Sequence, residues 1–222
     1  LQTALKDLSV KHSDVVRLGV LGKTYEGRDI PLVTLGANPD DKSIAAVFFV
    51  GGHHAREHIS VETPLKVAQK LAELWTAGDL RVRQLLTNRT VHIVPLLNVD
   101  GAEYDIESGR YRSWRKNRRP NGDGTYGVDL NRNYDHQWGT VGASGNTSSD
   151  TYYGRAPFSE PETQAVRDFL VANKNVTLVH SYHTFSELIL YPWGYTNGRV
   201  SDQKDFEIHL TMAKKMSTWN GY

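Results

Sequence analysis

Residues 47–58 of this 222-residue chain, VFFVGGHHAREH, join an apolar run to two glycines and then to a cluster of polar side chains. The run is apolar on both faces, which is typical of a strand in the middle of a sheet that is covered by helices. Side chains that follow such a strand lie at its carboxyl end, where open α/β sheets carry their sites. The stretch therefore predicts an α/β fold with a candidate site at the exit of this strand.

The rest of the chain alternates apolar runs with helical patterns, as α/β domains do. Ser60 is expected to cap a helix that runs to about Trp75, and residues 159–162, SEPE, form a capping box before a second helix. An amphipathic pattern predicts a third helix over residues 206–216. Residues 100–158 show little periodicity, and so long a loop inside a domain is usually functional. The strands are expected at residues 30–35, 44–50, 91–97, 176–179 and 188–191.

Composition narrows the classes of protein and partner. An apolar content of 39% predicts one core and one domain, residues 1–222. With 26 basic and 25 acidic residues, the charge balance favours neither nucleic acid nor an anionic membrane as partner. The lack of cysteine excludes a disulfide framework and a thiolate metal site. No apolar run approaches the roughly 18–20 residues of a membrane span, and the start at Leu1 resembles a processed or trimmed end.

The strand exit supplies part of a metal-ligand set. His54 and Glu57 form a His-x-x-Glu pair, and His183 lies far along the chain in the segment SYHTF. Three nitrogen and oxygen ligands leave the fourth tetrahedral position open, which is the arrangement of a catalytic zinc site. The pattern predicts metal-assisted hydrolysis.

Two other interpretations of this cluster compete. A lone histidine in a surface loop needs no function, but three His, one Arg and one Glu within residues 53–58 disfavour that view. His54, Glu57 and His58 also fit a pattern in which two histidines on one helix face bind zinc and the glutamate is the base. That alternative needs a helix across all five residues, whereas the preceding strand and Gly51-Gly52 favour a strand exit.

Two further segments combine arginines with amide side chains. They are residues 111–119, YRSWRKNRR, and residues 127–135, GVDLNRNYD. Guanidinium groups are planar forks that suit carboxylates and oxyanions, so the pair is expected to hold an anion. Interleaved aromatic residues make nucleic-acid binding an alternative for the first segment, but the near-neutral total charge disfavours it. A solvated loop is the simplest interpretation for Arg110, Arg112 and Arg119.

Taken in order, these motifs resemble those of the zinc metallocarboxypeptidases, and among them the bacterial carboxypeptidase T group. The resemblance implies a mixed, largely parallel eight-stranded sheet flanked by helices, the metallocarboxypeptidase fold. It implies removal of single C-terminal residues from peptides with a free C-terminal carboxylate, a Zn²⁺ cofactor and an extracellular, secreted protein. Relatives of this group also bind calcium, although no acidic cluster in the sequence fixes a calcium site. The motifs are GKTYEGR (22–28), HAREH (54–58), NVDG (98–101), SWRKNR (113–118), DLNRN (129–133) and HTFSELILYP (183–192).

The resemblance gives a role to each matching position at the metal. His54, Glu57 and His183 match the zinc ligands. Asp129 matches the carboxylate that orients the first zinc histidine and fixes its tautomer.

Other matching positions concern the substrate. Arg118 matches the residue that polarises the scissile carbonyl and stabilises the oxyanion. Phe185 stands where many relatives have tyrosine, so one hydroxyl contact to the substrate is expected to be missing. The remaining matches are Asn131 and Arg132, which clamp the terminal carboxylate, and the auxiliary Arg56 and Arg115 along the substrate path.

The resemblance also predicts that part of the catalytic domain lies beyond Tyr222. In the family, the general-base glutamate, the tyrosine that closes over the substrate and the specificity-determining side chain all follow this position. Glu187 lies four residues after His183, but it matches a strand residue without a catalytic part. The domain is therefore expected to be truncated at its C-terminal end, with an open sheet edge that is unfavourable alone.

Two functions follow from this expectation. The first is an active carboxypeptidase whose last part is the remainder of the same polypeptide or a complementary fragment. The second is a zinc domain that lacks the base and binds peptide C-termini without cleavage. The presence of both the zinc ligands and the substrate clamp favours the first.

Overall fold

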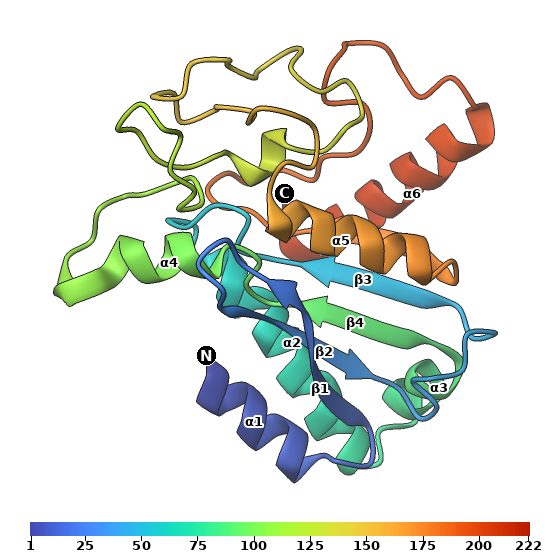
Figure 1. Ribbon diagram of the computed structural model, residues 1–222. Coiled ribbons are helices and arrows are strands. Elements are labelled where there is room, and N and C mark those ends of the chain that lie inside the picture. The colour runs from blue at the N-terminus through green and yellow to red at the C-terminus, as the bar shows by residue number, and fades with distance from the viewer.

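The computed structural model describes residues 1–222, and its centre is a five-stranded sheet (Figure 1). The strands are β1 (Val16–Lys23), β2 (Asp29–Leu35), β3 (Ala46–Val50), β4 (Thr90–Val94) and β5 (Val176–Ser181). Their order is β1-β2-β4-β3-β5, in which β3, β4 and β5 are parallel and β2 is antiparallel to both of its neighbours, β4 and β1. The predicted mixed sheet is confirmed, with five strands in this chain rather than eight.

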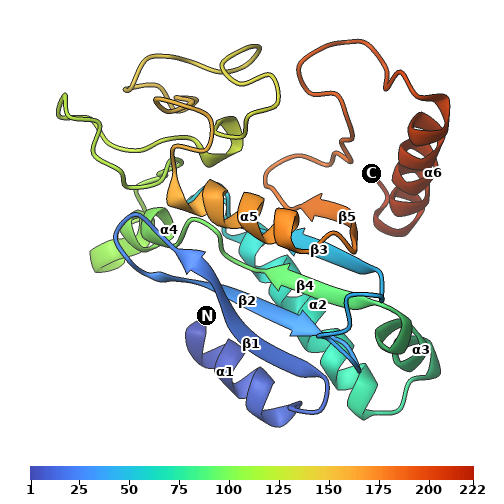
Figure 2. The ribbon, with the colours of Figure 1, turned by 45° about the vertical axis from the view of Figure 1, so that its right-hand side comes forward.

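Helices cover both faces of the sheet (Figures 1 and 2). The helices are α1 (Gln2–Lys11), α2 (Ile59–Thr76), α3 (Leu80–Asn88), α4 (Val99–Ile106), α5 (Pro161–Ala172) and α6 (Gln203–Asn220). The first three pack on one face, and α5 packs on the other. None of the helices combines the length and the hydropathy that a membrane crossing requires.

Strand β3 contributes apolar side chains to both layers, as predicted. Phe48 and Val50 are buried beneath α5, and the rings of Phe48 and Phe169 lie 5.2 Å apart. Val47 and Phe49 pack against the opposite core under α2. Because successive side chains of a strand point to opposite faces, this alternation makes β3 a central strand.

The structure corrects several local predictions. Residues 188–191 do not form a strand, and Leu188 and Leu190 are 63% and 82% exposed. An apolar run forms a strand only beside a partner, and no strand of this chain pairs with it. Ser60 does not cap α2; its hydroxyl donates to the Glu57 carbonyl at 2.6 Å and accepts from the Gly52 amide at 3.2 Å. The predicted capping box is also absent, because the Ser159 hydroxyl donates to the side chain of Glu160.

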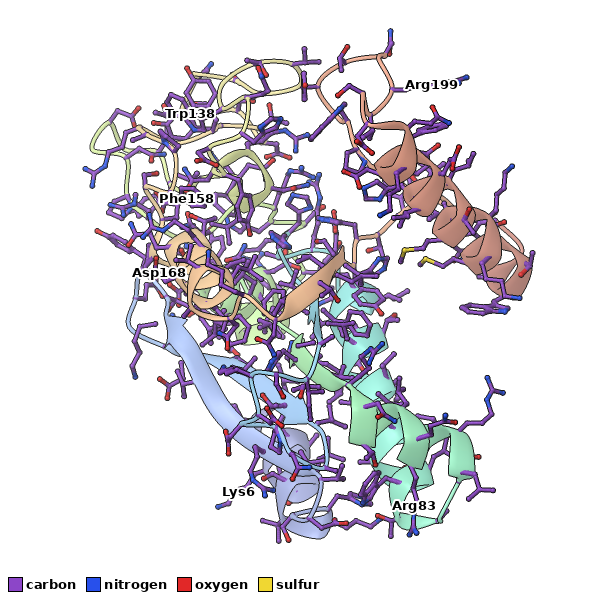
Figure 3. The ribbon with its side chains drawn as sticks, turned by 90° about the vertical axis from the view of Figure 1, so that its right-hand side faces the viewer. Lys6, Arg83, Trp138, Phe158, Asp168 and Arg199 are labelled. Atoms are coloured by element: carbon purple, nitrogen blue, oxygen red, sulfur yellow. The ribbon has the colours of Figure 1, made fainter.

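The long irregular segments gather beyond the carboxyl ends of the three parallel strands (Figures 1 and 2). They are residues 107–160 and residues 182–202; the loop predicted over residues 100–158 begins later than expected, because Val99–Ile106 form α4. Strand β5 forms one edge of the sheet, and its Val179 is exposed. Helix α6 stands apart from the layers and has no buried residue (Figure 3).

Candidate metal centre

Two glycines let the chain turn sharply from β3 into the site. A Cβ added to Gly51 would lie 2.1 Å from the Ser60 carbonyl oxygen. Gly52 has a φ of +62°, and a Cβ there would lie 2.6 Å from the Leu96 side chain. The turn therefore needs both glycines. Helix α2 begins only at Ile59, so the ligand segment is a strand exit and the continuous helix of the alternative pattern is absent.

His54, Glu57 and His183 converge at the carboxyl ends of β3 and β5, with one ligand atom of each lying within 4.8 Å of the others. His54 Nδ1 lies 2.7 Å from Glu57 Oε1, and His183 Nδ1 lies 2.9 Å from Glu57 Oε2. The two Nδ1 atoms are 3.2 Å apart. Two nitrogen ligands of one tetrahedral zinc ion lie about 3.4 Å apart, so the donor set and its spacing fit zinc.

Glu57 is prepared to act as an anionic ligand. Burial by itself favours the neutral acid, but hydrogen bonds from His183 and His54 hold the pKa of Glu57 well below its ordinary range. The backbone amide of Thr184 also donates to its carboxylate at 3.1 Å. Glu57 is 7% exposed, whereas the His183 side chain is 31% exposed. Glu57 is therefore shielded from solvent, whereas His183 is partly accessible to it.

Asp129 orients the first histidine. Its Oδ1 lies 3.0 Å from His54 Nε2, and it also accepts the Asn131 amide at 2.9 Å. Although burial opposes ionisation, the hydrogen bond from His54 and the charges of His54 and Arg115 lower the pKa of Asp129. Once a metal ion occupies Nδ1, a carboxylate at Nε2 would hold the remaining proton of the ring there. The structure thus places the Asp129 carboxylate against His54 Nε2.

Arg115 and Arg118, which belong to the same basic segment, lie at different places in the structure. Arg115 donates to Asp129 through Nε at 3.1 Å and Nη2 at 2.9 Å, and it lies 4.0 Å from Glu57. Arg118, which was expected at the scissile carbonyl, is not brought to this cluster. Its guanidinium stacks 3.6 Å from the ring centre of Tyr104 and lines a separate cavity of about 540 Å³. The rings of Trp114 and Tyr126 also face Arg118, at 5.0 and 4.7 Å.

The other predicted substrate residues lie around the opening. Arg132 donates to the carbonyl oxygens of Gly142 at 2.8 Å and Asn131 at 3.0 Å. Arg56 binds Asp150 at the surface, at 3.1 Å. Phe185 is 95% exposed, so the structure gives it no packing role.

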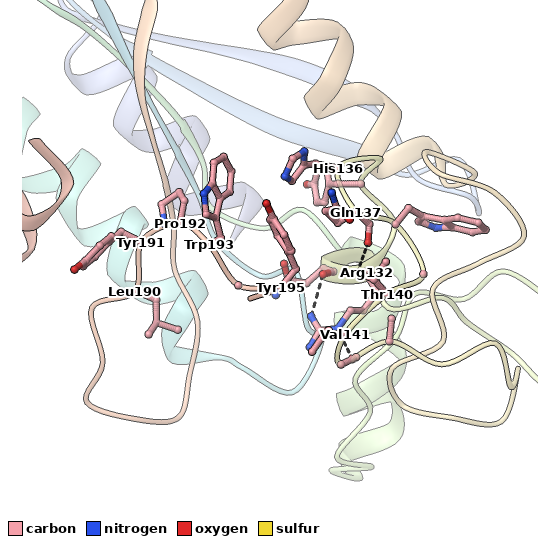
Figure 4. A pocket seen from close by; sticks show the side chains of 17 residues that line it. Arg132, His136, Gln137, Thr140, Val141, Leu190, Tyr191, Pro192, Trp193 and Tyr195 are labelled. Carbon is pink, nitrogen blue, oxygen red and sulfur yellow. Dashed lines mark hydrogen bonds between the residues drawn. The ribbon is translucent and has the colours of Figure 1, made fainter. Parts of the chain in front are cut away.

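A pocket of about 640 Å³ opens beside Asn131 and Arg132 (Figure 4). Its walls come from residues 131–143 and 190–195, which belong to the two different irregular segments. The walls are rich in aromatic rings, and His136 stacks on Trp193 at 5.1 Å.

A buried network ties the two basic segments together, and its carboxylates were not predicted. The Asn117 side chain donates to Glu160 at 2.7 Å and accepts from the Val128 amide at 2.8 Å. Arg119 also donates to Glu160, at 2.8 Å. Glu162 lies beside them, and burial raises its pKa to about 7. In the sequence, Glu160 and Glu162 stand at the start of α5, and their pattern was interpreted as part of a helix cap.

The sequence also predicted no role for His53, which directly precedes the ligand His54. His53 is buried, with Nε2 2.9 Å from the Tyr134 hydroxyl and Nδ1 3.3 Å from the Ser181 hydroxyl. Burial and the neighbouring His183 and His54 hold the pKa of His53 well below its ordinary value. The sequence shows the adjacent pair His53-His54, but no local pattern gives a role to His53, which lies outside the His-x-x-Glu pair.

The zinc carboxypeptidase family model matches residues 1–221. Zinc carboxypeptidase of Saccharothrix mutabilis subsp. capreolus is 36% identical over 228 residues, 99% of this chain and 52% of that protein. Carboxypeptidase B of Astacus astacus is 34% identical, over 94% of this chain and 67% of that protein.

Solved structures agree with the sequence relatives. Carboxypeptidase A from Helicoverpa armigera superposes with a TM-score of 0.80 at 32% identity, covering 96% of this chain and 51% of that chain. The chain spans about half the length of the Saccharothrix relative and of this structure. With a family match over nearly every residue, the chain belongs to the zinc carboxypeptidase family.

Proposed function

We propose that this chain carries the metal site and the substrate clamp of an enzyme that hydrolyses the C-terminal peptide bond of peptides and proteins. The observation that carries the proposal is the convergence of two Nδ1 atoms and one carboxylate near a pocket whose lining includes Asn131 and Arg132. The first group fits a catalytic zinc, and the second fits a terminal carboxylate. Membership of the zinc carboxypeptidase family supports both assignments.

His54, Glu57 and His183 would hold the ion. Zinc bound there supplies Lewis acidity, which activates water and polarises the scissile carbonyl. Asp129 holds the proton of His54 on Nε2 and thereby keeps Nδ1 available.

Arg115, rather than Arg118, is the residue to which we assign stabilisation of the developing oxyanion. Its guanidinium is held in place by the buried Asp129 and lies beside Glu57, so it is preorganised next to the reacting carbonyl. Arg118 is held by aromatic faces at a different cavity. Two arginines three residues apart thus have separate tasks, the first electrostatic and the second structural.

Asn131 and Arg132 would bind the free carboxylate of the substrate. Main-chain carbonyls already orient Arg132, so little conformational freedom is lost when it binds an anion. The adjoining pocket would receive the terminal side chain, with Trp193 and Tyr195 as stacking surfaces (Figure 4). Recognition of the free carboxylate would restrict cleavage to the last peptide bond.

The proposed reaction also needs the general-base glutamate that is expected after Tyr222. The remainder of the same polypeptide or a complementary fragment would carry it. Three expectations from the sequence resemblance stay predictions: that the protein is secreted, that it belongs to the carboxypeptidase T group, and that it has a calcium site. No observation in the site favours a domain that binds without cleaving.

The test uses the natural protein with blocked dipeptides that end in a free carboxylate or in an amide. We expect hydrolysis of the free acid alone, loss of activity with a chelator and recovery with zinc. Cleavage of the amide at an equal rate, or activity that survives complete zinc removal, would refute the proposal.

A further inference from the structure

His53 is a buried histidine that the proposed function does not use. It precedes His54 directly, and its ring stacks on that of His183 with centres 5.5 Å apart and planes at 28°. Both of its nitrogens have partners, the Tyr134 hydroxyl at 2.9 Å and the Ser181 hydroxyl at 3.3 Å. A buried imidazole paired at both ends holds neighbouring elements in a defined arrangement.

The Ser181 hydroxyl extends this pairing to the metal site. Its Oγ also lies 3.1 Å from His183 Nε2. His183, Ser181, His53 and Tyr134 therefore form one continuous hydrogen-bonded chain. The chain connects the end of β5 with the exit of β3 and with the loop after Arg132. It runs from a metal ligand to a residue that lines the pocket.

The donor and acceptor roles follow from the ligand atom of His183. When Nδ1, which faces Glu57 and His54, binds a metal ion, the proton of the neutral ring lies on Nε2, and Nε2 donates to Ser181 Oγ. The hydroxyl proton of Ser181 is then directed to His53 Nδ1. A neutral imidazole has one donor and one acceptor, so His53 Nε2–H donates to the Tyr134 oxygen.

We propose that Ser181, His53 and Tyr134 are positioning residues that fix the tautomer and ring plane of His183 for zinc and connect the metal to the substrate pocket. The inference rests on the proposed function only in that His183 binds the metal. The two histidines then differ, because a buried carboxylate orients His54 whereas neutral groups orient His183. Groups that orient a metal ligand contribute to affinity although they never touch the ion.

The experiment measures the zinc dissociation constant by competition with a chromophoric chelator, in the absence of peptide. Ser181→Ala is expected to raise the constant on the order of 10-fold, the usual effect of losing a partner of a metal ligand. Tyr134→Phe should raise it by a smaller factor, although Tyr134 contacts no ligand. The double variant should bind zinc as Ser181→Ala does, because the loss of Ser181 already disconnects Tyr134. Tyr153→Phe is the matched control, since its hydroxyl has no hydrogen bond in the structure and zinc affinity should not change.

A further readout separates positioning from simple stability. Ser181→Ala should alter the visible spectrum of the Co²⁺-substituted protein, which a change in stability alone would leave unaltered. Unchanged affinity in both single variants would overturn the proposal, and so would effects that multiply in the double variant. If the wild type binds zinc but cleaves no peptide, the proposed function fails while this inference stands; if it binds no zinc, both fail.

Discussion

Arg115→Ala is expected to lower kcat far more than Arg118→Ala, which reverses the roles that the motif suggests. The Arg115 guanidinium lies 4.0 Å from the Glu57 carboxylate. At an effective dielectric constant near 20, unit charges about 4 Å apart interact by about 4 kcal/mol. Loss of one oxyanion donor in other enzymes costs about 2.7–4 kcal/mol, or roughly 10²- to 10³-fold in kcat. We expect a decrease of that size for Arg115→Ala.

Arg118→Ala should instead affect stability. Its guanidinium faces three aromatic rings. At roughly 0.5–1 kcal/mol for each cation–π contact, the variant should lose about 1–3 kcal/mol in the free energy of unfolding. Its kcat should remain close to that of the wild type.

The assay measures kcat and KM on a blocked dipeptide, together with zinc content and denaturant unfolding for each variant. Zinc content matters because Arg115 also contacts Asp129, and loss of metal would imitate loss of charge stabilisation. Arg115→Lys is the matched variant, since it retains the charge without the bidentate geometry, and its kcat should be intermediate. A large decrease of kcat in zinc-loaded Arg118→Ala, with Arg115→Ala near wild type, would refute the assignment.

Three further predictions concern other parts of the chain. Asp129→Asn should weaken zinc binding by roughly 10- to 100-fold, because the amide no longer holds the proton on His54 Nε2; chelator competition measures this, and unchanged affinity would contradict the orienting role. Arg132→Ala should raise KM for substrates with a free C-terminus, and an equal loss on C-terminally amidated peptides would argue against a carboxylate clamp. Glu162 has a folded pKa of about 7, above its unfolded value of 4.5, so its contribution to stability is fully present below pH 4.5 and is lost as the pH rises through 7. A shift of that size corresponds to on the order of 3 kcal/mol, so unfolding curves of Glu162→Gln should lack this part of the pH dependence, and identical profiles for both proteins would exclude it.

Several elements could be predicted because their signals are local. A few neighbouring residues are enough to restrict the backbone at three kinds of place: the apolar run of β3, the amphipathic faces of α2 and α5, and the glycines after Val50. Strand β1 was missed because its exposed side chains and two glycines give no clear alternation. Residues 188–191 show the opposite error, since an apolar pattern without a neighbouring strand did not form one.

The sequence by itself determined the donor set of the site, because a His-x-x-Glu pair after a central strand and one remote histidine supply an incomplete tetrahedral shell whatever the remaining details. Only the tertiary structure shows which arginine lies beside it. Arg115 and Arg118 belong to the same motif, and they separate because one meets a buried carboxylate and the other meets three aromatic faces. Likewise, only folding brings His53 into contact with Tyr134 and Ser181, which lie 81 and 128 residues away from it along the chain.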